Sequence, residues 1–392
     1  MIFQALGARY GFGAAVKHAF ARGTEADSEK LRQALVKRYG GEAVLYQKGR
    51  AALAAAVRLA TNGQGGKVAI SGLTCYSVVQ AVEAADCTPV FVDIRESDLQ
   101  FGAKELEAAI KKHADIKAVV VQNMLGIPAD IAAIQKLADK TGIVIIEDLA
   151  HSAGAQYADG REVGTVGDIT MLSFGRDKAI DSVNGGALVV RNHKNPLAFP
   201  VIMPSSSWQF RDHIYPLIAW LTRVLYPVKL GRYVMGASIK AGLVVRSADG
   251  EVDETLCLPH WQAKLAHEQV TSLTTAAVRR RQKAQEYQAL LKYLLPNGMG
   301  QVGEAPVRVP LVVDNRDEVV SHLGTRGVQV NDIWYDVPVS PQRFYDRAHY
   351  PVGECPNAVR IAAKLVNLPT HGRISNADIK YISKLVREVA RA

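Results

Sequence analysis

The residues best suited to chemistry are a lysine and an aspartate in two neighbouring motifs. Lys178 lies in SFGRDKAIDSVNGGALVV (173–190), in a short loop that a glycine pair follows. Asp148 lies in EDLAHSAGA (147–155), directly after the apolar run IVII. Desolvation lowers the pKa of a buried amine, and the neutral amine attacks carbonyl groups. The combination indicates amine chemistry on a carbonyl, although a lone loop lysine more often faces solvent, and a lone carboxylate suits a helix cap or a metal at least as well.

The elements that must position these residues alternate between strands and helices. From about residue 28 to 195, apolar strand patterns alternate with helical ones, which is typical of parallel strands joined by crossover helices. Ligands bind at the carboxyl ends of such strands, where Asp148 falls. We expect an α/β fold with a doubly wound, mostly parallel sheet. Strands are expected at 43–46, 67–70, 88–92, 118–122, 143–146, 169–174 and 185–191, and helices at 28–39, 50–61, 76–85 and 130–141.

The second half of the chain has a different pattern. A Ser/Pro-rich break, MPSSSW, precedes an apolar, basic segment, and the polar run RSADGEVDE follows it. One long helical pattern then covers 261–295, and strand or helix patterns follow at 308–312, 328–334 and 376–390. Because a single core rarely grows past ~250 residues, 392 residues suit two domains. We expect a large cofactor-binding domain at 1–250, with the apolar, basic insert at about 205–246, and a smaller C-terminal α/β domain at 251–392.

Composition and charge favour an ordinary globular enzyme. Apolar residues make up 48% of the chain and charged residues 22%, both usual values. The net charge of +9 comes from basic residues spread along the chain, with the densest run at 279–281, so we expect no nucleic-acid partner. The four cysteines are widely spaced, which indicates neither a zinc site nor a disulfide framework, and no metal is expected.

The segment at 213–245 is unusual because it is both apolar and basic. No acidic residue stands between Asp212 and Asp249, and its uncharged stretches are too short to span a bilayer. It suits either an apolar arm buried on the domain or in a dimer interface, or an interfacial helix on anionic lipid. Since the N-terminus lacks a signal-peptide pattern, we expect a cytoplasmic protein, peripheral to the inner membrane face under the second alternative.

Long stretches of the sequence resemble the DegT/StrS-type family of sugar-nucleotide aminotransferases, which have the fold of aspartate aminotransferase. The resemblance covers nearly the whole chain. It implies the fold type I of pyridoxal-phosphate (PLP)-dependent transferases and PLP as the cofactor. The matching stretches are TPVFVDI, GIPADIAAIQKLADKTGIVIIEDLAHSAGA, YADGREVGTVGDITMLSFGRDK with its NGGALVV tail, WYDVPVSP, CPNAVRIAAKLVNLPTH and ISNADIKYISKLV.

The resemblance implies roles for four residues around the cofactor ring and phosphate. Lys178 matches the lysine that forms a Schiff base with PLP and then shuttles a proton. Asp148 matches the acid that pairs with the pyridine nitrogen and keeps it protonated. His151 falls where relatives carry Gln or His against the ring hydroxyl, although packing alone would also explain it. Ser173 matches a hydroxyl that binds the cofactor phosphate.

Further matches concern the phosphate, the ring face and the substrate. Gly49 and Arg50 match a Gly-Thr pair at a helix start, where free N–H groups suit a phosphate; Arg50 either adds charge there or points elsewhere. Relatives stack an aromatic side chain on the ring, where this chain has Cys75 with Tyr76 beside it, so either residue is a candidate. Tyr335 matches an aromatic residue near the sugar-nucleotide site.

Two departures from the family pattern concern the phosphate and the substrate. Relatives have an Asn-containing motif that reaches the neighbouring subunit's cofactor phosphate, but here ETLCLPHWQAKLAHEQV lacks the Asn. His260, a residue of the insert, or Arg50 would have to replace it. Ser340 stands where a His is common.

The resemblance implies an aminotransferase that moves an amino group from an amino acid, with glutamate as the expected donor, to a keto-sugar. We expect the sugar to be nucleotide-linked and to serve the biosynthesis of surface polysaccharide, glycolipid or secondary metabolites. One rival is a sugar dehydratase-like enzyme that uses PLP or its amine form, against which Lys178 argues because such relatives have His there. The other is a degenerate, cofactor-binding regulatory protein. Family precedent implies a homodimer.

Overall fold

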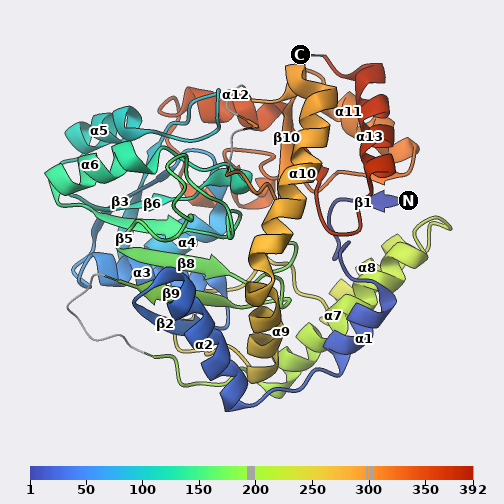
Figure 1. The fold of residues 1–392 in the computed structure, drawn as a ribbon, viewed down its shortest axis with the longest axis horizontal. Coiled ribbons are helices and arrows are strands. Elements are labelled where there is room, and N and C mark those ends of the chain that lie inside the picture. Colours follow the sequence, from blue (N-terminus) through green and yellow to red (C-terminus); the bar gives the residue numbers. More distant parts are fainter. Residues whose placement is uncertain (192–198, 297–298, 301–302, 392) are drawn as a thin grey trace.

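A seven-stranded sheet forms the centre of the larger part of the molecule (Figure 1). The computed structural model describes residues 1–191, 199–296, 299–300 and 303–391. Only β9 runs antiparallel to its two neighbours, and all other neighbouring strands are parallel. The expected α/β fold with a mostly parallel sheet is therefore confirmed. In sheet order the strands are β2 (Glu42–Tyr46), β9 (Gly186–Val190), β8 (Ile169–Ser173), β7 (Val144–Asp148), β6 (Ile116–Val121), β3 (Gly66–Ser71) and β5 (Cys87–Val92).

Successive side chains along these strands enter two different hydrophobic cores. In β6, Val119 and Val121 pack in one core, whereas Ala118 and Val120 pack in the other. This alternation follows from the two-residue period of a strand, and it explains why buried parallel strands are continuous apolar runs. Helices must therefore cover both faces. One core includes side chains of α2 (Glu25–Tyr39), α5 (Ala103–Lys112) and α6 (Ile131–Thr141), and the other includes those of α3 (Gly49–Ala60), α4 (Tyr76–Ala84) and α12 (Pro356–Lys364).

Local capping fixes where the first long helix begins. The helix expected at 28–39 starts earlier, because Asp27 Oδ2 accepts a hydrogen bond from the Thr24 N–H at 2.9 Å and completes a capping box. The Ala-rich helix expected at 50–61 is α3, and its first residue is Gly49. Helix α3 follows β2 directly, so its N-terminus lies beside the strand ends that carry the candidate site.

The long helical pattern at 261–295 is two helices rather than the single one predicted. They are α9 (His260–Thr271) and α10 (Leu273–Leu291), which Figure 1 shows one below the other. Between them, Ser272 leaves helical geometry at φ −98° and ψ 7°, and its hydroxyl donates back to the carbonyl oxygens of Glu268 and Gln269, both at 3.3 Å. Such back-bonding of a serine bends helices, which explains the break.

The C-terminal part has a hydrophobic core of its own. Strand β10 (Arg308–Val312) pairs antiparallel with β13 (Leu365–Pro369), and α11 (Arg316–Thr325) and α13 (Asn376–Val389) pack beside them. The strand predicted at 328–334 is shorter than expected, because only β11 (Val328–Gln329) forms, paired with β1 (Ile2–Phe3). The residues that follow β11 line the cavity described below. Helix α9 contributes to the core of the large sheet, and the predicted domain boundary near residue 250 stays a prediction.

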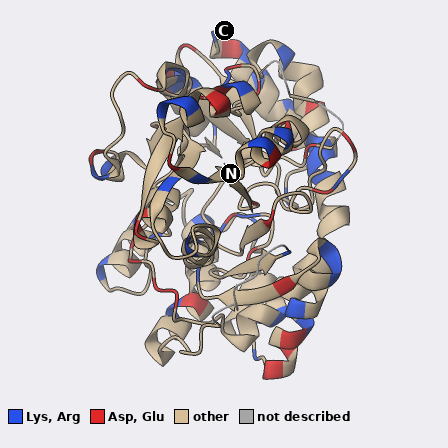
Figure 2. Ribbon diagram, turned by 90° about the vertical axis from the view of Figure 1, so that its left-hand side faces the viewer, with Lys and Arg blue, Asp and Glu red and all other residues tan. Residues whose placement is uncertain are grey.

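The apolar, basic segment forms two helices at the side of the molecule. They are α7 (Ser206–Val224) and α8 (Gly231–Lys240), which lie next to α1 (Phe12–Ala19) in Figure 1. Arg223 fixes this arrangement because its guanidinium donates to the carbonyl oxygens of Leu6 and Gly7, both at 2.6 Å. Among the described residues, no helix has the length and apolar character needed to cross a membrane. In Figure 2 basic and acidic residues are interspersed over helices and loops.

Candidate active site

A cavity of about 1010 Å³ lies at the carboxyl ends of β7 and β8. Eight of the nine residues predicted from the sequence line it, and the exception is Tyr76. Strand β7 ends at Asp148 and β8 ends at Ser173, while Lys178 lies in the loop between β8 and β9. The eight are Gly49, Arg50, Cys75, Asp148, His151, Ser173, Lys178 and Tyr335.

Lys178 and His151 are in direct contact. The lysine Nζ lies 2.9 Å from Nε2 of His151, and Nδ1 of the same ring accepts a hydrogen bond from the Leu125 N–H at 3.2 Å. Burial is the main cause that lowers the pKa of the Lys178 amine, and burial and then Lys178 itself lower the pKa of His151. Both groups are therefore biased toward their neutral forms, which is the state a nucleophilic amine requires.

Trp334 covers this pair and was missed from the sequence. Its ring is stacked on His151 with 4.8 Å between the ring centres, and Lys178 Nζ lies 4.2 Å from the ring centre. The backbone N–H of Trp334 donates to Asn367 Oδ1 at 2.6 Å. The Arg308 guanidinium lies 3.5 Å from the centre of the Trp334 ring. The motif WYDVPVSP contained this signal, because Trp334 directly precedes the predicted Tyr335.

Asp148 and its neighbour Glu147 have opposite surroundings because they point to opposite faces of β7. Glu147 is fully buried and accepts hydrogen bonds from the N–H groups of Gly164 and Val166, each at 2.7 Å. Asp148 lines the cavity, where its Oδ1 accepts from the Ala150 N–H at 2.8 Å. Burial raises the pKa of Asp148 to about 6, against the opposing effects of this hydrogen bond and of Lys178. The Glu147 carboxylate thus holds the loop after β7, whereas Asp148 remains available to a bound group.

Gly49 and Ser173 form a close contact at one end of the cavity. A Cβ atom on Gly49 would lie 2.8 Å from Ser173 Oγ, so only glycine leaves this space open. Gly49 is the first residue of α3, where backbone N–H groups lack helical partners and the helix dipole attracts an anion. This end of the cavity therefore fits a phosphate group.

Arg50 does not extend into this space but binds the chain that follows the insert. Its guanidinium donates to Gln80 Oε1 at 2.8 Å and to the Gly250 carbonyl oxygen at 2.9 Å, and it also bonds the Ser247 carbonyl. Of the two alternatives predicted for Arg50, the structure shows the one in which it points elsewhere. His260, considered from the sequence as a replacement for the missing Asn, bonds Ser28 Oγ at 2.8 Å and does not line the cavity.

Cys75, rather than Tyr76, faces the cavity. Strand β4 (Thr74–Cys75) pairs with β12 (Val339–Ser340) at the cavity wall, and Cys75 and Ser340 both line it. The Tyr76 ring instead stacks on Phe344, with 4.8 Å between ring centres. Tyr76 is therefore held outside the described cavity, whereas the Trp334 ring centre lies 4.2 Å from Lys178 Nζ.

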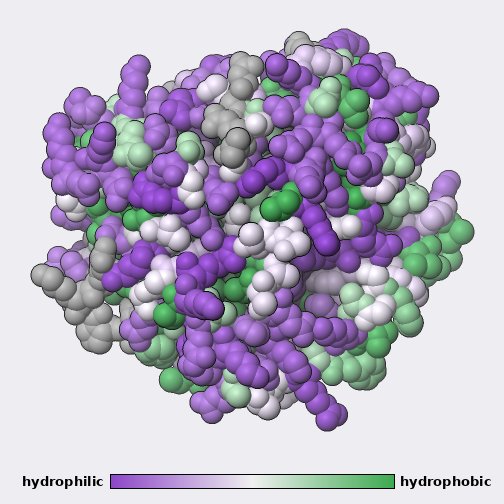
Figure 3. Space-filling view, viewed as in Figure 1, coloured by the Kyte–Doolittle hydropathy of each residue, from purple (hydrophilic) through white to green (hydrophobic). Residues whose placement is uncertain are grey.

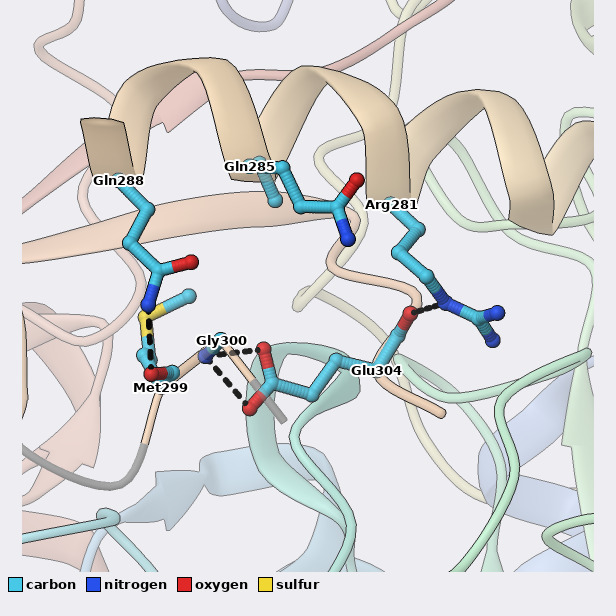
Figure 4. Close-up of a pocket in the computed structure, with 7 residues that line it drawn as sticks. Arg281, Gln285, Gln288, Met299, Gly300 and Glu304 are labelled. Carbon is cyan, nitrogen blue, oxygen red and sulfur yellow. Dashed lines mark hydrogen bonds between the residues drawn. The ribbon is translucent and has the colours of Figure 1, made fainter. Parts of the chain in front are cut away.

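A second, much smaller pocket lies against α10 and is shown in Figure 4. Its volume of about 10 Å³ is close to the least that one water molecule needs. Two of its polar side chains are already bonded: Arg281 Nε donates to the Glu304 carbonyl oxygen at 2.9 Å, and Gln288 Nε2 donates to the Met299 carbonyl oxygen at 3.0 Å. The pocket is a packing feature without a place for a substrate.

A large sheet with a lysine between β8 and β9 and an aspartate at the end of β7 defines a PLP-dependent enzyme of fold type I. The comparisons agree, because a family model matches residues 24–198 and 252–387. The chain belongs to the DegT/DnrJ/EryC1/StrS aminotransferase family, and it is an aminotransferase with PLP as its cofactor.

Relatives and solved structures match most of the chain. UDP-N-acetyl-3-dehydro-alpha-D-glucosamine 3-aminotransferase of Acidithiobacillus ferrooxidans is 26% identical over 343 residues, which are 86% of this chain and 82% of the relative. The crystal structure of DesV from S. venezuelae gives a TM-score of 0.72 at 25% identity, covering 96% of this chain and 93% of that chain. The PLP form of a putative sugar aminotransferase from Streptococcus pneumoniae has the same TM-score at 18% identity, covering 98% and 97%.

The family match leaves out the stretch from 199 to 251, which contains α7 and α8. This segment nevertheless forms part of the cavity wall, through Tyr215 and Tyr226 among others. The guanidinium of Arg176, which lies in the same loop as Lys178, is 3.6 Å from the Tyr215 ring centre and donates to the Val245 carbonyl oxygen at 2.7 Å. The insert is thus an integral wall of the site.

Proposed function

We propose that this aminotransferase moves an amino group from glutamate to a keto-sugar carried on a nucleotide. The observation that carries the proposal is the contact between the neutral-biased Lys178 amine and His151, in one cavity with the buried Asp148 carboxylate. Relatives and neighbours support a sugar acceptor: one is named for a UDP-linked dehydro-amino-sugar, and Helicobacter pylori PseC is described as an aminotransferase in pseudoaminic acid biosynthesis. PseC gives a TM-score of 0.68 at 17% identity.

The proposed roles follow from the position of each side chain. Lys178 Nζ would tether the cofactor, then take a proton from the substrate carbon and deliver it to the cofactor carbon. The Asp148 carboxylate holds a proton on the pyridine nitrogen, and the bound cofactor then supplies the electron sink for the reaction. His151 orients the Lys178 amine and contacts the ring hydroxyl. Gly49 and Ser173 receive the phosphate. Cys75 lies where relatives cover the ring, and Tyr335 contacts the sugar.

The visible absorption spectrum of the purified protein tests this proposal. We expect a cofactor band that depends on Lys178, disappears on addition of glutamate and returns when a nucleotide-linked keto-sugar is added. Borohydride reduction followed by peptide mass spectrometry should place the cofactor on Lys178, and the Lys178→Ala variant should lack this adduct. Failure to bind PLP at all would overturn the proposal. A Lys178 adduct that responds to no amino donor would instead favour a regulatory protein that binds the cofactor without turnover.

A homodimer is the assembly that we propose, on the precedent of the family. Light scattering coupled to size-exclusion chromatography measures the mass directly and would contradict the proposal if it returned the mass of one chain.

The outer face of α7 and α8 is proposed to contact an anionic lipid surface. Val228 and Leu230, in the turn between these helices, are 63% and 53% exposed, and Tyr233 in α8 is 61% exposed. Figure 3 shows apolar residues gathered at the margin where Figure 1 places α7 and α8. The stretch 213–248 contains cations but no acidic residue. In a two-fold contact with a second copy, these cations would face the same cations and repel them. An anionic lipid surface would attract them instead.

A further inference from the structure

Lys48 is a half-buried cation in the cavity wall that has no counter-charge in the described structure. It directly precedes Gly49 as the N-cap residue of α3 and lines the cavity. Its Nζ lies 4.7 Å from the ring centre of Trp208, in the first turn of α7. Among residues 1–191, 199–296, 299–300 and 303–391, no hydrogen bond or ion pair to this ammonium group is found. An ammonium group in such a position is costly unless an anion joins it.

The nearest acidic side chains are already engaged elsewhere. Asp212 accepts hydrogen bonds from Asn184 at 2.7 Å and from Gln262 at 3.2 Å. Asp249 forms an ion pair with Arg343 at 2.7 Å. Burial and then the neighbouring Arg50 lower the pKa of Lys48 to about 8, which means that its surroundings disfavour positive charge. The two carboxylates that act on Lys48 are therefore engaged with other side chains, and neither forms an ion pair with its ammonium group.

Two other cations of the cavity wall, Arg50 and Arg176, already bond carbonyl oxygens of the chain that follows α8, although Arg176 Nε has no partner among the described residues. The Arg50 guanidinium is occupied by Gln80 and by carbonyl oxygens of 247–250. Arg176 is bound to the Val245 carbonyl and lies over the Tyr215 ring. Lys48 differs from both arginines because it lies directly beside Gly49 and its ammonium group has no polar partner in the described residues.

We propose that Lys48 Nζ is the counter-charge of the cofactor phosphate and that Trp208, from the insert, holds it in place. A single chain would then bind the phosphate dianion through the free N–H groups at the start of α3, the Ser173 hydroxyl and the Lys48 ammonium. The Asn motif that relatives use would not be needed. This inference rests on the proposed function, because it assigns a further residue to the same cofactor site. The insert thus takes part in binding the cofactor as well as in forming the cavity wall.

Binding of pyridoxamine 5′-phosphate and of pyridoxamine to the full-length, cofactor-free protein tests this role. The two probes differ only in the phosphate, and neither has an aldehyde that would react with Lys178. We expect Lys48→Gln to weaken binding of the phosphorylated probe about ten- to hundredfold, the range for a hydrogen bond to a charged group. The dissociation constant of pyridoxamine should change less than about twofold. Isothermal titration calorimetry measures both constants.

Two further variants separate a direct contact from a structural effect. Trp208→Leu should weaken binding of the phosphorylated probe by about two- to fivefold, because it removes only the cation–π contact that orients Lys48. Lys67→Gln is the matched control: Lys67 is a partly buried lysine outside the cavity, paired with Asp115 at 2.9 Å, and its loss should change neither constant.

Each outcome of the titrations has one meaning. Equal losses for both probes, or no loss in Lys48→Gln, would overturn the phosphate contact while leaving the proposed aminotransferase intact. If Lys48→Gln does not fold, the Trp208→Leu titration decides, and an unchanged affinity would overturn the inference. A wild-type protein that binds neither probe would overturn the proposed function itself.

Discussion

His151 and Lys178 share a hydrogen bond whose direction is set from outside the pair. Because His151 Nδ1 accepts from the Leu125 N–H, the ring proton of the neutral imidazole lies on Nε2. That proton points at Lys178 Nζ, 2.9 Å away, so the lysine must accept with its lone pair. The backbone of Leu125 thus selects a tautomer that stabilises the uncharged amine.

This relationship predicts that replacing His151 raises the pKa of Lys178. In His151→Leu the lone pair loses its donor, so the apparent pKa for covalent attachment of PLP should rise and attachment near neutral pH should slow about three- to tenfold. His151→Gln can still present an N–H and should retain much of the wild-type rate. Stopped-flow absorbance over a pH series measures both quantities. An unchanged pH profile in His151→Leu would show that the contact with His151 does not set the lysine pKa.

Asp148 predicts a pH-dependent cost to folding in the absence of cofactor. Burial raises its pKa from 3.8 to about 6, so between these values the folded state holds a proton that the unfolded state has released. Stability therefore falls as pH rises through that window, by at most about 3 kcal/mol. Asp148→Asn keeps the acceptor for Ala150 N–H and removes this cost, so the cofactor-free variant should gain stability at about pH 8 and not at about pH 4.

Urea unfolding of both proteins at the two pH values measures this difference. Asp115→Asn is the control, because the pKa of this exposed carboxylate is lowered by Lys67 and its removal brings no gain at high pH. PLP affinity should fall in Asp148→Asn although the fold is more stable. A variant less stable than wild type at both pH values would show that the Asp148 charge is compensated in the folded protein.

Gly49→Ala should impair the site through a single methyl group. Its Cβ would lie 2.8 Å from Ser173 Oγ and 2.9 Å from Ser173 Cβ, at the end of the cavity that fits the phosphate. We expect a loss of PLP affinity and a destabilisation of about 1–3 kcal/mol from overpacking. Gly13→Ala is the matched control: it is also near the start of a helix, nothing lies within 4 Å of its Cβ position, and the change should stabilise by up to about 1 kcal/mol. Equal effects of the two substitutions in thermal unfolding and PLP titration would contradict this account.

The sequence predicted the part of the site that is determined locally. Asp148 follows a buried strand and Lys178 lies between two strands, so the alternation of strands and helices along the sequence brings both to one edge of the sheet. The contact of Trp208 with Lys48 had no such signal, because it joins α3 to an insert that the family pattern does not contain. The choice between Cys75 and Tyr76 likewise depended on Phe344, which is remote in sequence.

The exposed turn between α7 and α8 gives the last prediction. Val228 and Leu230 flank Lys229 there, and an aspartate at both apolar positions would remove apolar burial in lipid and add repulsion from anionic headgroups. The double variant Val228→Asp/Leu230→Asp should bind phosphatidylserine-containing vesicles more than about tenfold more weakly than wild type. Co-sedimentation with these vesicles and with vesicles of phosphatidylcholine alone measures the effect.

A matched control and the molecular mass decide between lipid and a second copy of the chain. Val352 is 99% exposed and lies outside this turn, so Val352→Asp should leave vesicle binding unchanged. If wild-type protein ignores both vesicle types and the double variant changes from dimer to monomer, the turn belongs to a protein interface and the lipid contact is wrong. If the double variant keeps the mass of the wild type but no longer binds the anionic vesicles, the lipid contact is supported. Helices α7 and α8, which form part of the cavity wall, would then also hold the active site at a membrane surface.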